Sequence, residues 1–350
     1  MFHKQPTNQQ IFAVLEQFLP SLKSSSLHIG AVTGVSIDRG KVTLSIAIDP
    51  KQSQALEPTK FEIEAHIKTL SGVKSVNVIW TAHKFPENPE SQSLTSRDIN
   101  LKKIRNIIAV ASGKGGVGKS TVTINLALAL RDLGLKVGVL DADIYGPSVP
   151  KMMGLSGKPT FEDDRIQPMI RYNIKTMSMG YLIPEDTPVI WRGPMIQKAL
   201  QQILFDVEWG ELDCLVIDLP PGTGDVQLTL VQKVNLSGAV IISTPQDIAL
   251  IDALKGHNMF LKMGVPVLGL VENMSYFKCE SCGHQSEIFG HGGARTEAAA
   301  RGIDFLGEIP LDGNICKSSD RGEPIVESHP DTDLSAAYLA IAKKVMEQLQ

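Results

Sequence analysis

The segment from Gly113 to Thr121 has the pattern G-x-x-x-x-G-K-[ST], which binds the phosphates of a nucleoside triphosphate. Its glycines let backbone amides approach phosphate oxygens, and the N-terminus of the helix expected to follow favours anions. Lys119 is placed to reach the β- and γ-phosphates, and the Ser120 hydroxyl to bind the Mg²⁺ between them. The sequence therefore predicts an ATPase whose loop contacts come from Gly113, Lys114, Gly115, Gly116, Val117, Gly118, Lys119, Ser120 and Thr121.

Lys114 is one lysine more than phosphate binding requires, and it stands too early in the loop to be the phosphate lysine. A cation there is either a solvated surface charge or a group that reaches the nucleotide of a second subunit and stabilises charge during hydrolysis. The residues alone leave both readings open. The run GKGGVGKST, with this first lysine, resembles the deviant P-loop ATPases, which include the septum-site and partition ATPases and the nitrogenase iron protein. That resemblance implies an ATP-dependent homodimer in which Lys114 acts across the interface.

Two short apolar strands are expected to end in aspartates close to this loop. The first, 137–141, leads to Asp141 and Asp143, and the second, 213–218, has the Walker B pattern and ends in Asp218. Ligands bind at the carboxyl ends of such strands in α/β sheets. We expect Asp218 to hold Mg²⁺ through water and Asp143 to hold Mg²⁺ or orient the attacking water. Helix capping is an equally simple role for Asp141.

The loops that follow these aspartates, 144–148 and 219–225, are rich in proline and glycine. Loops of this kind can move when the γ-phosphate leaves, so we expect both to act as switches. The candidate catalytic residues are Asp143 and Asp218, together with Lys114, whose role is implied by the resemblance.

Cys279 and Cys282 have the C-x-x-C spacing that lets two thiolates bind one metal centre. Two thiolates are half of a usual four-ligand site, and no second C-x-x-C exists in the chain. A symmetric dimer would bring four cysteines together around its axis, and soft thiolates there fit an iron-sulfur cluster. Two alternatives remain open: a redox dithiol, or a zinc site within one chain completed by His284, His291 and Cys316.

Hydrophobic periodicity predicts an α/β protein with two domains. Residues 1–82 are expected to form a small domain with helices over 8–22 and 61–70 and strands over 41–48 and 73–80. The polar, proline-containing stretch 83–104 is expected to be a linker. Residues 105–350 are expected to form a P-loop NTPase domain with a mostly parallel sheet, and a helix over 334–349 that docks on the core. His28, His66 and His83 are interpreted as surface or packing residues.

Composition excludes several classes of function. A formal net charge of −4 and a pI near 6.1 give no field that would gather nucleic acid. No apolar run approaches the roughly 20 residues that span a bilayer, and the N-terminus lacks the apolar core of a signal peptide. Four cysteines in 350 residues make a disulfide framework a poor explanation. We expect a cytoplasmic protein with no nucleic-acid or membrane partner.

Several motifs together resemble one family, the Mrp/ApbC iron-sulfur cluster carriers. They are the P-loop, the cysteine pair, and the segments 141–148 (DADIYGPS), 191–195 (WRGPM) and 218–225 (DLPPGTGD). The resemblance covers residues 105–350 and implies a homodimer that holds a labile [4Fe-4S] cluster between paired Cys279 and Cys282, and passes it to apoproteins in an ATP-dependent way. The partners that it implies are these apoprotein acceptors and a cluster donor. The segments 26–35 and 70–78 resemble domain of unknown function 59, which is associated with iron-sulfur maturation. Three further positions resemble adenine contacts of the deviant P-loop ATPases: Asn273, Pro310 and Asp312.

Two other functions are compatible with parts of the sequence. A positioning ATPase of the septum-site or partition type would share the fold but needs a membrane-binding device, and leaves the cysteine pair unexplained. A zinc-stabilised adaptor would use ATP only to lock a dimer. Two cysteines per subunit also fit a [2Fe-2S] centre as well as a [4Fe-4S] centre.

Overall fold

The computed structural model describes Ile11, Leu15 and residues 32–38, 40–47, 56–81, 101–163, 165–182 and 193–349. The chain forms two compact units, Met1–Ser93 and Leu94–Gln350, each described here by itself. The predicted linker falls almost wholly outside the described residues, as do His28, His83 and most of the predicted helix 8–22.

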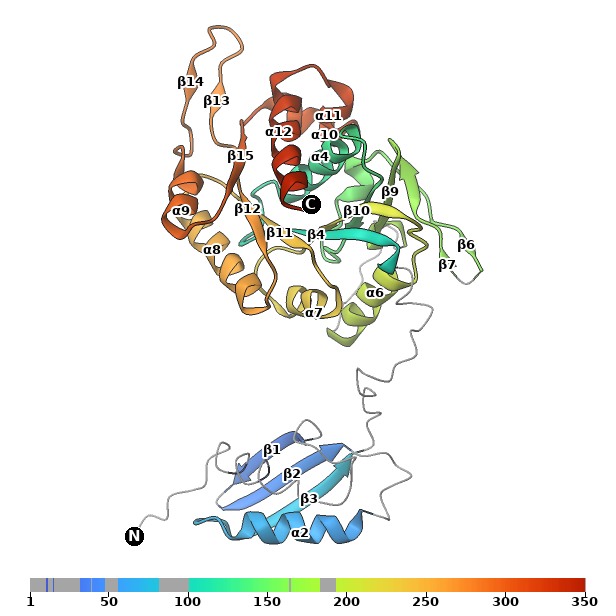
Figure 1. Ribbon diagram of the computed structural model, residues 1–350, viewed down its shortest axis with the longest axis vertical. Coiled ribbons are helices and arrows are strands. Elements are labelled where there is room, and N and C mark those ends of the chain that lie inside the picture. The colour runs from blue at the N-terminus through green and yellow to red at the C-terminus, as the bar shows by residue number, and fades with distance from the viewer. Residues whose placement is uncertain are drawn as a thin grey trace. The chain divides into compact units, whose positions relative to one another are not determined.

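The first unit is a three-stranded sheet covered by a helix (Figure 1). Its strands β1 (Val32–Asp38) and β2 (Lys41–Ala47) are antiparallel, and β3 (Ser75–Thr81) runs parallel to β2 after helix α2 (Glu57–Lys68). Alternate residues of β2 and the inner face of α2 build its core, as the sequence periodicity predicts. The buried members are Ile11, Leu15, Val42, Leu44, Ile46, Leu56, Ile63, Ile67 and Val78.

Helix α2 begins four residues earlier than predicted, because Pro58 occupies the first turn, where its missing N–H is not needed. Strand β1 was not predicted as a strand. Gly34 interrupts its alternation, and the register shifts at the same place.

The second unit is built around an eight-stranded sheet in the order β15-β12-β11-β4-β10-β5-β9-β8. Neighbouring strands are parallel except β8 and β9, which confirms the mostly parallel sheet predicted from the sequence. The strands are β4 (Ile104–Ser112), β5 (Val137–Asp141), β8 (Met169–Arg171), β9 (Ile174–Ser178), β10 (Leu212–Asp218), β11 (Gly238–Ser243), β12 (Val267–Asn273) and β15 (Phe305–Ile309).

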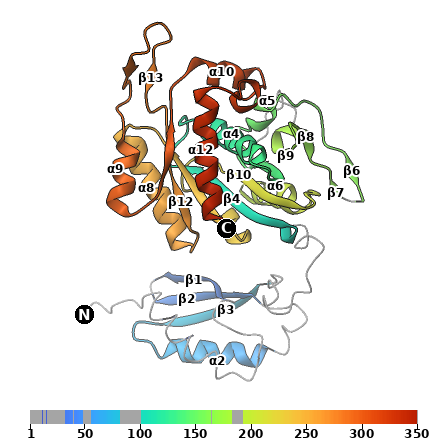
Figure 2. The same cartoon turned by 45° about the horizontal axis from the view of Figure 1, so that its top comes forward.

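Helices cover both faces of this sheet (Figures 1 and 2). One face packs against α4 (Lys119–Asp132), α5 (Val149–Met152), α10 (Gly313–Asp320), α11 (Ile325–Ser328) and α12 (Asp333–Gln348). The other packs against α6 (Gly193–Phe205), α7 (Asp225–Lys233), α8 (Asp247–Lys262) and α9 (Gly293–Arg301). Helix α12 buries Tyr338, Ile341 and Val345, as expected of a helix that docks on the core.

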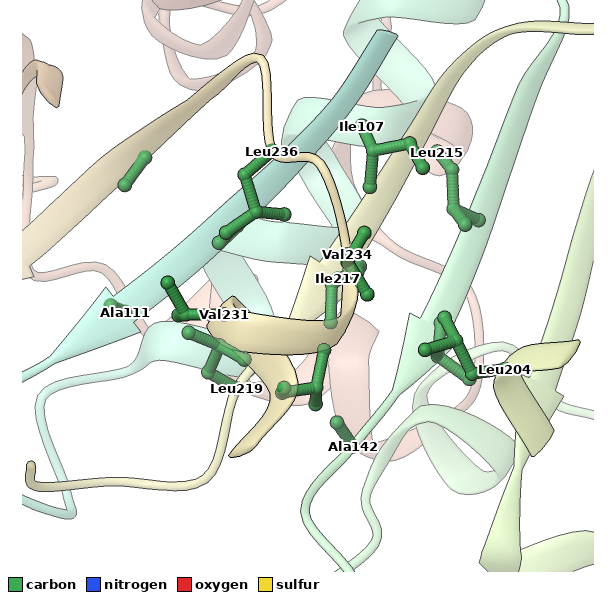
Figure 3. Close-up of a cluster of buried hydrophobic side chains, with 14 of the residues drawn as sticks. Ile107, Ala111, Ala142, Leu204, Leu215, Ile217, Leu219, Val231, Val234 and Leu236 are labelled. Carbon is green, nitrogen blue, oxygen red and sulfur yellow. The ribbon is translucent and has the colours of Figure 1, made fainter. Parts of the chain in front are cut away.

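Strand β4 shows why the layers form. Ile108 and Val110 belong to the cluster with α4 and α12, whereas Ile107, Ala109 and Ala111 belong to the cluster with α6, α7 and α8. An all-apolar strand buried on both sides is typical of parallel sheets. Figure 3 shows side chains of the second of these clusters, among them Ile107 of β4, Leu215 and Ile217 of β10 and Val231 of α7.

Two small hairpins extend from this sandwich. They are β6 (Phe161–Glu162) with β7 (Arg165–Ile166), and β13 (Phe277–Lys278) with β14 (Gln285–Ser286). In both views the β13–β14 hairpin projects away from the sheet, beyond the end of β15. Among the helices described, none has the length and apolar character needed to cross a lipid bilayer.

Candidate functional site

The predicted site residues collect at the carboxyl edge of the sheet. Strand β10 lies between β4 and β5, and Asp218 is in register with Val110 on one side and Asp141 on the other. The phosphate-binding loop leaves β4 at Ser112, so it begins beside both aspartates. The parallel register therefore brings together three segments that are far apart in the sequence.

The geometry of the loop explains its glycines. Gly116 and Gly118 have φ values of 82° and 77°, which other residues rarely adopt. Gly113 has no room for a side chain, because a Cβ there would lie 2.1 Å from the carbonyl carbon of Asp252 in α8. Backbone conformation and close approach to α8 thus require glycine at these positions.

A buried cluster joins the loop to the Walker B strand. Lys119 Nζ lies 2.6 Å from Asp218 Oδ1, and the Ser120 hydroxyl donates to Asp218 Oδ2 at 2.5 Å. Thr123, one turn along α4, donates to Oδ1 at 2.8 Å. Asp218 is fully buried, so these donors compensate a charge that would otherwise be costly. Hydroxyl and carboxylate oxygens are the ligands that Mg²⁺ prefers, so Ser120 and Asp218 fit that ion.

Thr123 was not predicted as a site residue. Its position four residues after Lys119, on the same face of α4, is the signal that could have found it.

Asp141 organises the loop after β5. One carboxylate oxygen accepts from the amides of Ser148 and Val149 and from the Ser178 hydroxyl, and the other accepts from the amide of Asp143. The carboxylate therefore holds both ends of the predicted switch loop 144–148, and caps the start of α5. Burial and the neighbouring charge of Asp218 raise the pKa of Asp141 to about 7.

Asp143 directly precedes this loop and accepts a hydrogen bond from the amide of Gly146 at 3.2 Å. It lines a pocket of about 440 Å³ that both predicted switch loops share. Gln227, at the start of α7, donates to the Pro220 carbonyl and so ties the second loop to its helix. The pocket is lined by Asp143, Tyr145, Gly146, Pro220, Pro221, Gly224, Val226 and Gln227.

Lys114 is half-buried in the first turn of the loop, where its carbonyl accepts from the Ser112 hydroxyl at 2.9 Å. Within the part of the chain that the structure describes, no acidic side chain forms an ion pair with Lys114.

The three predicted adenine contacts lie at the ends of β12 and β15. Asn273 is buried, and its amide donates to the Val117 carbonyl of the phosphate-binding loop at 2.8 Å. Asp312 accepts from the amide of Asn314 and caps α10, and Pro310 is half-buried just before it. An adenine contact by these residues stays a prediction.

The cysteine pair lies in the turn of the β13–β14 hairpin. The Cys279 amide donates to the His284 carbonyl at 2.9 Å, and the Gly283 amide donates to the Cys279 carbonyl at 2.8 Å. Hydrogen bonds from the backbone amides of Cys282 and Ser281 lower the pKa of the Cys279 thiol. Cys282 is exposed and Cys279 half-exposed. This turn differs from a thioredoxin-like dithiol, which lies at the start of a helix.

The alternative zinc site within one chain is not formed by the described residues. Cys316 lies on α10, with its sulfur 3.8 Å from Asp320. Among the residues described, the one group of three potential metal ligands is Glu272, His291 and Glu308, which contains no cysteine. Glu272 in that group already accepts three hydrogen bonds, from Ser275, Gly292 and Ala294.

Known proteins resemble this chain over both units. A family model described as NUBPL iron-transfer P-loop NTPase matches residues 103–346, and one described as iron-sulfur cluster assembly protein matches residues 8–79. An iron-sulfur cluster carrier protein of Aquifex aeolicus is 54% identical over 71% of this chain and 69% of its own length. One from Escherichia coli K12 is 43% identical over 94% of this chain and 89% of its own length.

Solved structures share the fold of the second unit. A nucleotide-binding protein of Archaeoglobus fulgidus in complex with ADP has a TM-score of 0.60 and 44% identity, over 67% of this chain and 94% of that protein. The septum site-determining protein MinD of Pyrococcus horikoshii, complexed with Mg-ADP, has a TM-score of 0.52 over 69% and 95% of the two chains. Its 23% identity shows a common fold and no more.

Proposed function

Because this chain belongs to the family of NUBPL iron-transfer P-loop NTPases, we propose that it carries an iron-sulfur cluster on Cys279 and Cys282 and delivers it under the control of ATP. The observation that carries this proposal is the cysteine pair, held in a projecting turn on a chain whose phosphate-binding loop is complete. The same loop in a protein that only positions other molecules would leave the hairpin and its thiols without a role.

Two copies of the chain are needed to hold the cluster. Each chain supplies two thiolates, and no group of three potential ligands among the described residues includes either cysteine. A cluster with four thiolate ligands is therefore best held between the hairpins of a homodimer. A [4Fe-4S] cluster is the form we propose as cargo, and apoproteins that lack their own cluster are the acceptors.

The nucleotide is held by the loop and processed by the aspartates around it. Lys119 must exchange the Asp218 carboxylate for phosphate oxygens, which frees Asp218 to act with Ser120 on Mg²⁺. Ser120 and Asp218 would hold Mg²⁺, which when bound would neutralise charge on the phosphates. Asp143 faces the pocket between the switch loops, where it can orient the attacking water.

Lys114 has no described acidic partner in its own chain, so its ammonium group is available to a second copy. Positive charge supplied from a neighbouring subunit stabilises negative charge in phosphoryl transfer. We propose this role for Lys114 in the homodimer.

Anaerobic reconstitution with iron and sulfide tests the cargo. The wild type, the double variant Cys279→Ala/Cys282→Ala and the control Cys316→Ala are compared by visible absorption, metal content and subunit mass. About four irons per two chains in the wild type and the control, lost in the double variant, would support the carrier. Stoichiometric zinc that resists replacement would favour the adaptor instead, and an absence of metal from the wild type would overturn the proposal.

A further inference from the structure

Glu272, at the end of β12, connects the two arms of the cysteine hairpin. Its Oε1 accepts from the Ser275 hydroxyl at 2.6 Å and from the Gly292 amide at 2.9 Å, and its Oε2 accepts from the Ala294 amide at 2.7 Å. Ser275 lies on the arm that enters the hairpin, whereas Gly292 and Ala294 lie where the returning arm begins α9. The side chain is 0% exposed, so one buried carboxylate fixes the base of the hairpin.

The next two residues contact the phosphate-binding loop. The side-chain amide of Asn273 donates a hydrogen bond to the Val117 carbonyl. Met274 has a φ of 57°, in the left-handed region that costs a side chain such as methionine about 1–3 kcal/mol. Its Cε lies 3.5 Å from the position that a Cβ of Gly118 would take. Three consecutive residues therefore touch the hairpin base on one side and the nucleotide loop on the other.

The segment between these contacts has little freedom to absorb a displacement. The Ser275 amide donates to the Ile309 carbonyl at 3.0 Å, and the Leu311 amide donates to the Tyr276 carbonyl at 2.7 Å. The entering arm is thus bonded to the chain that leaves β15. A packed and hydrogen-bonded segment changes between discrete arrangements rather than bending gradually. A shift at Val117 must then move the base of the hairpin.

We propose that Glu272 is a positioning residue that transmits occupancy of the phosphate-binding loop to the cysteine hairpin, through Asn273 and Met274 within one chain. This inference rests on the proposed function in so far as nucleotide controls the cysteine pair, but it does not need a cluster to be present. It places the coupling inside the protomer, so it does not depend on the geometry of a dimer.

The test follows thiol reactivity in the full-length, reduced chain without iron. Alkylation of Cys279 and Cys282 by iodoacetamide is timed by peptide mass spectrometry without nucleotide, and at saturation with MgADP or a non-hydrolysable ATP analogue. Cys316, on α10, serves as the internal reference. In the wild type we expect the rate at the pair to change about fivefold or more, as for a typical coupling between sites, and the rate at Cys316 to stay constant.

Two variants break the connection at different points. Glu272→Gln replaces an acceptor of three hydrogen bonds with an amide whose NH₂ faces a buried donor, and Ser275→Ala removes only the entering arm. Each is compared at its own saturating nucleotide concentration, fixed by titration. The matched control Thr296→Ala removes a hydrogen bond to the Gly292 carbonyl without touching Glu272.

We expect the nucleotide effect on the pair to fall below about twofold in Glu272→Gln, to shrink in Ser275→Ala, and to persist in Thr296→Ala. A wild type whose pair ignores nucleotide would overturn the inference. A full nucleotide effect in both single variants, Glu272→Gln and Ser275→Ala, would also overturn it. If Glu272→Gln does not fold, a full nucleotide effect in Ser275→Ala alone would overturn it. Failure of the proposed carrier function would be distinguishable: the wild type would take up no iron, while the alkylation rate of its cysteine pair would still change with nucleotide.

Discussion

The phosphate-binding loop and the cysteine hairpin are the two chemical regions of this molecule, and they are built in opposite ways. The loop lies between β4 and α4, and its buried Lys119 forms an ion pair with the buried Asp218 of β10. The hairpin consists of two strands of two residues and holds its thiols near solvent. Changes to this buried ion pair must therefore affect stability and function together, whereas changes in the hairpin should affect function more than stability.

The largest effect is expected for Lys119→Ala. It removes the phosphate contact and leaves Asp218 buried without its ion-pair partner, which costs about 3–5 kcal/mol of unfolding free energy. ATP turnover should fall by on the order of 10³-fold. Chemical denaturation and a turnover assay measure both losses. Lys255→Ala is the matched control, since its exposed pair with Asp252 contributes about 0–1 kcal/mol. A variant as stable as that control would contradict the importance of the buried pair.

Lys114→Ala should separate hydrolysis from binding. Lys114 forms no described ion pair within its chain, so the fold should tolerate its loss. We expect turnover to drop on the order of 10²-fold while nucleotide affinity, measured by titration, changes little. Unchanged turnover would rule out a role across the dimer interface.

Asp141→Asn should change how stability depends on pH. The pKa of Asp141 is raised from 3.8 to about 7, mainly by burial. Between these values the folded chain binds a proton that the unfolded chain has lost, so the unfolding free energy contributed by Asp141 decreases as pH rises. Asparagine lacks this titration. Thermal melts from pH 4 to pH 7 should therefore show a smaller decline in the variant, and parallel curves for the two proteins would refute this assignment.

The smallest effect on function is expected for Gly283→Ala in the hairpin. Gly283 has a φ of 70° and no neighbour within 4 Å, so alanine costs about 1–2 kcal/mol of local backbone energy. Because the turn carries no core residue, the melting temperature should fall by only about 2–4 °C, whereas iron should be held about tenfold less tightly. Gly157→Ala, also at positive φ with open space, is the control for backbone strain. Equal iron binding in both variants would mean that the turn does not position the thiols.

The same contrast explains what the sequence could predict. The loop, the strands that end in Asp141 and Asp218, and the cysteine pair all follow local patterns, and the structure has the predicted parallel sheet. The role of Glu272 depends on hydrogen bonds from Gly292 and Ala294, and so on the return of the hairpin to α9. Periodicity identifies strands, but it does not specify which donors meet at their ends.

Asp141, for which the sequence left helix capping open, accepts hydrogen bonds from the amides of Ser148 and Val149 at the start of α5. The alternative zinc site was proposed by counting possible ligands, among them His284, His291 and Cys316. In the structure Cys316 lies on α10, and His291 Nε2 lies 3.2 Å from Glu308 Oε2. Counting ligands in the sequence does not take into account where each side chain lies in the fold. Spacing within one turn is reliable, and spacing across elements is not.

The placement of the four cysteines has a consequence for how long the protein survives in air. Burial raises the pKa of Cys214 to about 12 and keeps it inert, whereas amide hydrogen bonds from Cys282 and Ser281 lower the pKa of Cys279 on the projecting turn. Oxidation by peroxide is therefore expected at Cys279 before it reaches the buried Cys214. Damage of this kind leaves the sandwich folded and is reversed by a thiol reductant in its early stages.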